Sequence, residues 1–271
     1  MRRGMHNVMK RAGRVAFGIF MIVMACMCGR VYLVERGAGT SEEAAVEAMS
    51  DDSKPRRDTG FVGESAEDGV VDFAALRGIN SEIFAWLYIP DTAVDCPVLQ
   101  SGQSDTFYED HNARGEEDDA GAVYIELANL TSMCDFNTVL HGKTGTDGAG
   151  LFADLYRFAD PDFFDDHEYV YLYLDGNVLT YEVFAAYERE NTSLIRTYDF
   201  TYLSGCGQFL NDLYGNRDMA MNLREGWENV SAYNYVITLT TQKAENAEHQ
   251  FVVVAVLVQD EAGTINRVVT E

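Results

Sequence analysis

The segment from Tyr169 to Tyr187 constrains the fold more than any other part of the sequence. Two runs rich in aromatic and β-branched residues, Tyr169–Leu174 and Val178–Tyr187, flank the short polar connection Asp175-Gly176-Asn177. Such residues favour strands, and a short connection containing Asp-Gly is a strong signal for a β-hairpin. The sequence therefore predicts an antiparallel strand pair as the nucleus of a β-rich domain.

Further short strands are predicted on both sides of this hairpin. Those near the C-terminus are apolar on both faces, as expected of strands buried in the middle of a sheet. The predicted strands are Trp86–Ile89, Cys96–Gln100, Ala122–Glu126, Asn137–Gly142, Tyr235–Thr241 and Phe251–Gln259. A set of about eight short strands indicates a closed or nearly closed barrel.

Helices are expected as insertions between these strands. Asp72 is placed to cap a short helix that runs through Arg77, and Ser81–Phe84 is interpreted as a further helical turn. Apolar residues recur at helical spacing from Leu151 to Phe158 and again within Phe200–Tyr214. The predicted fold class is mostly β with helical insertions.

The N-terminal residues indicate a membrane anchor. Residues 15–34 are apolar apart from Arg30, and about 20 such residues can span a bilayer. Residues 1–14 carry five positive charges and no negative ones, so the N-terminus is expected in the cytoplasm. The prediction is a single-pass transmembrane helix in the cell membrane.

Two alternatives to this anchor remain open. A cleaved signal peptide has a similar pattern, and Val23-Met24-Ala25-Cys26 resembles a lipoprotein cleavage box. All three interpretations export the rest of the chain. Residues 35–70 are poor in large apolar residues and are predicted to be a flexible acidic stalk, and 71–271 form the folded domain.

The exported part of the chain is strongly acidic. After residue 36 it contains 13 Lys and Arg against 43 Asp and Glu, a net charge of −30. Such a domain repels nucleic acid and anionic lipid, so nucleic-acid binding is excluded.

The cysteines form neither a disulfide framework nor a metal site. Cys26 and Cys28 lie in the apolar N-terminal run, which leaves Cys96, Cys134 and Cys206, widely spaced, in the domain. No CxxC or HExxH pattern is present. No metal and no cofactor are expected.

Several segments of the domain, in order and with sensible spacing from about residue 73 to residue 258, resemble class B sortases. No single segment is diagnostic, but the set is fairly specific. The segments are Trp86-x-x-Ile89-Pro90, Val94–Gln100, Phe107-Tyr108-x-x-His111, Gly121–Tyr124, Asn137–Lys143, Leu151-Phe152-x-x-Leu155, Ile237–Gln242 and Gln250–Val253.

This resemblance implies a sortase-like eight-stranded β-barrel and an extracytoplasmic location in a Gram-positive bacterium. Sortases are cysteine transpeptidases that cleave a sorting signal in a secreted protein and join it to an amine of the cell wall or a pilin. In their chemistry a cysteine forms the acyl enzyme, a histidine acts as general acid and base, and an arginine stabilises the oxyanion.

All three catalytic positions implied by the resemblance carry other residues. Lys143 stands at the histidine position, Gln242 at the cysteine position and Gln250 at the arginine position. An amide supplies no nucleophile, and lysine has an ordinary pKa too high for a proton shuttle at neutral pH. The sequence therefore predicts a catalytically degenerate sortase.

A degenerate sortase can still bind or present sorting-signal peptides, alone or beside an active sortase. The predicted groove residues are Lys143, Gln242, Gln250 and His141, which takes the place of a family tyrosine. One alternative is an active enzyme with a relocated nucleophile, in which Cys134 or Cys206 pairs with His141 or His111, while Cys96 is interpreted as a buried core thiol. Another is a structural envelope protein.

Overall fold

The structure is a computed structural model that describes residues 71–144, 150–216, 220–242 and 246–266. The cytoplasmic segment, the transmembrane helix and the stalk predicted for residues 1–70 lie outside these residues. Within the described ranges, no helix is long and apolar enough to cross a membrane.

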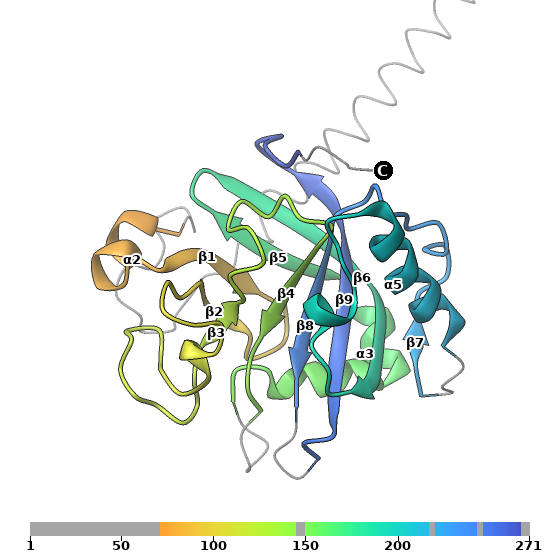
Figure 1. The fold of residues 1–271 in the computed structure, drawn as a ribbon, viewed down its shortest axis with the longest axis horizontal. Helices are drawn as coiled ribbons and strands as arrows, with labels where there is room; N and C mark the ends of the chain where they lie inside the picture. Colours follow the sequence, from red (N-terminus) through yellow and green to blue (C-terminus); the bar gives the residue numbers. More distant parts are fainter. Residues whose placement is uncertain (1–70, 145–149, 217–219, 243–245, 267–271) are drawn as a thin grey trace, which may run out of the picture. The chain divides into compact units, whose positions relative to one another are not determined.

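Eight strands close into a barrel (Figure 1). Their order around the barrel is β5-β1-β2-β3-β4-β8-β9-β6, and pairing of β6 with β5 completes the circle. A two-residue strand, β7, pairs with β6 at Ala185 and Ala186, beyond the residues of β6 that pair with β5. The bounds are β1 Ile83–Tyr88, β2 Asp95–Leu99, β3 Val123–Ile125, β4 Asn137–His141, β5 Tyr169–Leu174, β6 Asn177–Glu190, β7 Asn222–Leu223, β8 Val236–Thr241 and β9 His249–Asp260.

The predicted hairpin is confirmed and closes the barrel. β5 and β6 pair from Tyr169 opposite Glu182 to Leu174 opposite Asn177. Gly176 in the turn has a φ of 78°, a left-handed conformation that glycine adopts without steric cost. Because β6 continues for 14 residues, it also pairs along β9 and joins the two ends of the sheet.

Two parallel strand pairs, β2 with β3 and β4 with β8, are set into the otherwise antiparallel barrel. The β4–β8 pair runs from Asn137 opposite Val236 to His141 opposite Thr240. Because parallel strands end on the same side, the carboxyl ends of β4 and β8 lie next to each other. Residues that follow these two strands are therefore brought together.

The helices cover the barrel and one of them was predicted wrongly. Asp72 caps α2 by accepting a hydrogen bond from the Ala75 N–H, as expected. The helical turn expected at Ser81–Phe84 is absent, because β1 begins at Ile83 and pairing with β2 and β5 overrides the local preference. The bounds are α2 Phe73–Ile79, η1 Phe107–Glu109, η2 Ala153–Ala159, α3 Pro161–Asp166, α4 Leu194–Thr197 and α5 Leu203–Gly215.

The core consists of the barrel interior and two layers outside it. Leu140, Leu239 and Val253 belong to the interior cluster, and none of them is exposed. The apolar face of α5 packs on the outward side chains of β4, β8 and β9, and α2 packs on β1. β8 and β9 are thus buried on both sides, which explains their continuous apolar sequence.

Candidate functional site

A small polar pocket of about 170 Å³ lies where β4 and β8 end and β9 begins. It contains all four groove residues predicted from the sequence. Its lining residues are Tyr108, Glu109, Ala122, Tyr124, His141, Gly142, Lys143, Asn191, Thr240, Thr241, Gln242 and Gln250.

Lys143 is the second residue after β4 and is half-buried. The preceding Gly142 donates its N–H to the Thr240 carbonyl, 3.2 Å away, which extends the β4–β8 pairing by one residue. A Cβ at Gly142 would lie 2.6 Å from the ring of Phe152, so a larger residue at this point would force the ring or the backbone to shift. The Lys143 Nζ donates to the Asp119 carbonyl at 3.3 Å, which directs the cation toward the loop before β3.

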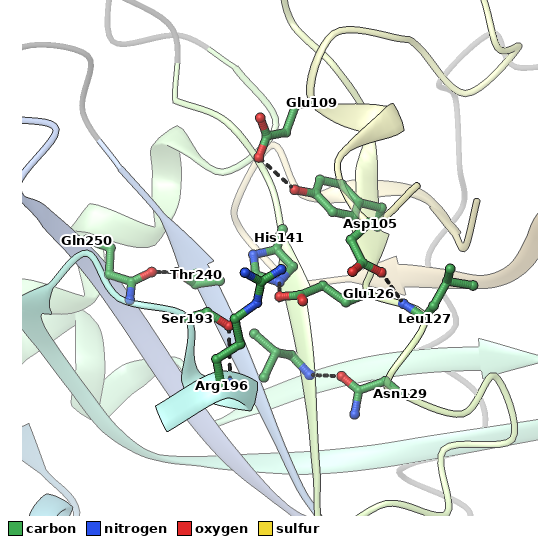
Figure 2. Close-up of polar contacts among 12 residues, drawn as sticks. Asp105, Glu109, Glu126, Leu127, Asn129, His141, Ser193, Arg196, Thr240 and Gln250 are labelled. Carbon is green, nitrogen blue, oxygen red and sulfur yellow. Dashed lines mark hydrogen bonds and ion pairs between the residues drawn. The ribbon is translucent and has the colours of Figure 1, made fainter. Parts of the chain in front are cut away.

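His141 forms a polar and aromatic cluster with residues of β3 and the segment after it. Its ring stacks on Tyr124, with centroids 5.1 Å apart. Its Nε2 atom is buried and lies 3.2 Å from Oε1 of Glu126, at an angle unsuited to a regular hydrogen bond (Figure 2). The His141 side chain lowers the pKa of Glu126 against the opposing effect of burial, and the positive charge of Arg196 lowers it further.

Tyr124 is in turn held by Glu109, which accepts a hydrogen bond from its hydroxyl at 3.1 Å. Burial, together with the negative charge of Glu109, raises the pKa of Tyr124 far above its ordinary value. The hydroxyl is therefore neutral at any physiological pH, and it acts as a hydrogen-bond donor and not as a base.

Both the oxygen and the nitrogen of the Gln250 side-chain amide form hydrogen bonds within the protein. Its oxygen accepts a hydrogen bond from the Thr240 hydroxyl (Figure 2). Its nitrogen donates to the carbonyls of Glu190 at 3.2 Å and Thr192 at 2.9 Å. Only 7% of the residue is exposed, so Gln250 joins β8, β9 and the segment after β6.

Gln242 lies at the exposed end of β8. Its side-chain oxygen accepts a hydrogen bond from the Asn191 amide, which also donates to the Ala247 carbonyl. The Gln242 nitrogen makes no hydrogen bond to any residue that the structure describes, and it remains available to a ligand.

The pocket lining offers no activated nucleophile. Among its described residues there is no cysteine or serine. The hydroxyl of Thr240 is bonded to Gln250, and that of Thr241 lies 2.9 Å from the hydroxyl of Thr144. The hydroxyls of Thr240 and Thr241 are therefore bonded to an amide oxygen and to another hydroxyl, neither of which is a general base.

The three cysteines of the domain lie elsewhere. Cys96 is buried in β2, which agrees with its interpretation as a core thiol. Cys134 and Cys206 line a different cavity, and their Sγ atoms lie 3.4 Å from the carbonyls of Ser132 and Phe200.

This second cavity is a groove of about 650 Å³ between the loop before β4 and the α4–α5 segment. Neither histidine proposed as a partner for its cysteines lines it. His141 faces the polar pocket, and His111 lies 2.7 Å from the Asp110 carboxylate and 2.9 Å from the Phe107 carbonyl. The structure thus does not bring a cysteine and a histidine together in either cavity.

In the part of the chain that the structure describes, no group of three or more His, Cys, Asp or Glu side chains is arranged to hold a metal ion. Three other charged residues in or beside the pocket, Glu109, Glu126 and Arg196, were missed from the sequence. Glu126 directly follows β3, two residues after Tyr124, and Tyr124 pairs with His141 in the sheet. Because alternate residues of a strand point to the same face, a carboxylate two residues after Tyr124 could have been predicted to lie near His141. Arg196, on the separate turn α4, offered none.

No family model matches the chain. Sortase B of Listeria monocytogenes is 31% identical over 172 residues, which cover 63% of this chain and 66% of that protein. The chain belongs to the class B sortase family. Sortase B of Staphylococcus aureus is 26% identical over 190 residues, which cover 69% of this chain and 75% of that protein.

Solved class B sortase structures share the barrel. Clostridium perfringens sortase B superposes with a TM-score of 0.60 at 25% identity, over 68% of this chain and 98% of that one. A Staphylococcus aureus sortase B–substrate complex also gives a TM-score of 0.60, at 24% identity, over 69% of this chain and 85% of that one. The chain thus has the sortase fold, and its polar pocket contains the three positions at which the resemblance implies the catalytic residues.

Proposed function

We propose that this chain is a sortase-like protein of the cell envelope that has lost transpeptidase activity and binds or presents sorting-signal peptides. The observation that carries this proposal is the content of the polar pocket. Lys143, Gln242 and Gln250 meet there, and no thiol lies among the lining residues that the structure describes.

The chemistry of these side chains argues against acyl transfer. Formation of an acyl enzyme needs a nucleophile beside a base, and an amide at Gln242 cannot attack a carbonyl. Stabilisation of an oxyanion needs donors aimed at it, whereas both donors of Gln250 are bonded to main-chain carbonyls. A pocket that lacks both the nucleophile and the oxyanion donor can still bind a peptide, and binding is the role that we propose for it.

Peptide binding is supported by the open cavities. The polar pocket and the larger groove are hollow, which favours a binding role over a purely structural envelope protein. The exposed Gln242 nitrogen and the Lys143 cation are placed to meet carbonyl or carboxylate oxygens of a bound chain. The partners we propose are sorting-signal peptides of secreted proteins, or an active sortase that this protein assists in surface-protein assembly.

We further propose that the protein is anchored in the membrane by residues 15–34, with the barrel outside the cell. The basic residues before this segment and the acidic stalk after it support that orientation. An exported barrel would meet its peptide partners at the outer surface of a Gram-positive cell.

The test is a reaction of the full chain with a pool of sorting-signal peptides and triglycine as amine acceptor, followed by mass spectrometry. We expect intact peptides and no acyl adduct, while an active class B sortase in a parallel tube cleaves its own peptide. A matched sample has every accessible cysteine alkylated. Cleavage that alkylation abolishes would contradict the proposal and would favour a relocated cysteine nucleophile.

A further inference from the structure

Arg196 stands at the junction between the larger groove and the surroundings of the polar pocket. Arg196 lines the groove and acts electrostatically on Glu126, which lies against His141 in the pocket. Figure 2 shows the Arg196 side chain extending from α4 toward Glu126 and His141. A chain lying in the groove and entering the pocket would pass this guanidinium.

The Arg196 guanidinium is unused by the described part of the protein. Its main-chain N–H bonds to the Ser193 hydroxyl at 3.3 Å, but its side chain makes no hydrogen bond and no ion pair within 4 Å to a described residue. Glu126 attracts it only from a longer distance. Because Arg196 is exposed and lines the groove, its five N–H donors are available to a ligand there.

The carboxylates of the groove are already occupied. Asp135 accepts hydrogen bonds from the Leu130 N–H at 2.6 Å and from the Asn129 amide at 3.1 Å. Asp199 accepts from the Thr201 N–H at 3.1 Å. These two acids shape the groove walls, and Arg196 is the one cationic side chain among the described lining residues.

The turn that carries Arg196 is fixed to the barrel. Leu194 is buried, and the Ser193 hydroxyl caps the turn. The preceding residues are held by Gln250, which donates to the carbonyls of Glu190 and Thr192. Gln250 therefore anchors the segment that carries the cation at the junction, although it offers no donor of its own.

We propose that Arg196 is the cationic anchor of the groove and that it binds a carboxylate of a bound peptide, from an Asp or Glu side chain. This inference rests on the proposed peptide-binding function. A guanidinium matches a carboxylate with two parallel hydrogen bonds. The exposed apolar side chains of Leu130 and Tyr202 on the same groove favour a ligand with apolar residues beside its acid.

The test uses two pools of random hexapeptides, acetylated and amidated, that differ at one fixed position, which is Glu in one pool and Gln in the other. The full chain is immobilised, and the retained peptides are measured by quantitative mass spectrometry. We expect about fivefold more retention of the Glu pool, the effect of one charge-assisted contact at a partly exposed site. Added salt should reduce this preference.

Three variants identify the responsible residue. Arg196→Gln should bring the ratio of Glu-pool to Gln-pool retention to about one, and Arg196→Lys should leave an intermediate ratio because it keeps the charge but not the planar fork. Arg77→Gln removes one positive charge from an exposed arginine that pairs with Asp175, on a different surface, and should leave the ratio unchanged.

The failures are distinguishable. If the wild-type chain retains neither pool above empty beads, the proposed peptide-binding function is contradicted, and the role of Arg196 in it is contradicted as well. If both pools are retained equally, or if the Glu preference survives in Arg196→Gln, peptide binding stands and the assignment to Arg196 is overturned.

Discussion

The walls of the barrel and the ends of three of its strands follow different constraints. In the walls, β8 and β9 present buried apolar side chains to the interior and to the layer under α5. At the ends of β4 and β8 and the start of β9, the side chains are polar, and they bond to one another or face solvent. The comparison teaches that the walls carry the fold that this chain shares with class B sortases, whereas the strand ends carry the polar side chains that line the pocket.

The largest expected effect is the difference in unfolding free energy between a substitution in the barrel wall and one at a nearby strand end. Leu239→Ala removes a fully buried side chain from the interior and should lower the free energy of unfolding by about 2–5 kcal/mol. Gln242→Ala, three residues further along and exposed, should change it by less than about 0.5 kcal/mol. Urea unfolding followed by circular dichroism measures both, and equal losses would contradict the division between walls and ends.

Gly142 sharpens the comparison because it lies at a strand end but is packed like a wall residue. Gly142→Ala places a methyl group against the Phe152 ring and should cost about 1–3 kcal/mol in the same unfolding experiment. Phe152→Leu in that background should recover part of the loss, as a double-mutant cycle would show.

The control for this prediction is Gly207→Ala. Gly207 lies within α5, where an added Cβ meets nothing within 4 Å, so the change should stabilise the protein by about 0.4–1 kcal/mol. A destabilised Gly207→Ala together with a neutral Gly142→Ala would reverse our reading of the two glycines.

The next prediction concerns Gln250 and asks whether a polar side chain at a strand end stabilises the fold. Gln250→Leu leaves the carbonyls of Glu190 and Thr192 without their donor and should cost about 1–3 kcal/mol. Gln242→Leu loses a contact at an exposed site and should cost less than about 0.5 kcal/mol. Similar values for the two variants would mean that the Gln250 hydrogen bonds contribute little.

The sequence predicted the walls well because their signals are local. The hairpin at Asp175-Gly176-Asn177 and the doubly apolar segments of β8 and β9 carry their own evidence in a few neighbouring residues. The helical turn expected at Ser81–Phe84 failed because strand pairing with distant residues decided its conformation.

The site was predictable only in part, for the same reason. The resemblance identified Lys143, Gln242 and Gln250, and the structure brings them into one pocket. The resemblance could not reveal that Gln250 donates hydrogen bonds to residues 58 and 60 positions away. It also could not reveal that Arg196 lies close enough to Glu126 to lower its pKa. Such contacts depend on the closed barrel and on a turn placed by tertiary packing.

The smallest effect concerns the Glu126–His141 contact and its dependence on pH. The pKa of Glu126 is lowered in the folded protein, chiefly by His141, so the unfolded chain takes up this proton first as the pH falls. The stabilisation is therefore complete above the ordinary glutamate pKa and is lost as the pH falls through the lower folded value. The difference in unfolding free energy between wild type and Glu126→Gln should be largest near neutral pH and should shrink in acid. Glu248→Gln, at an exposed carboxylate, is the control, and a gap that grows on acidification would show that Glu126 is held in its protonated form.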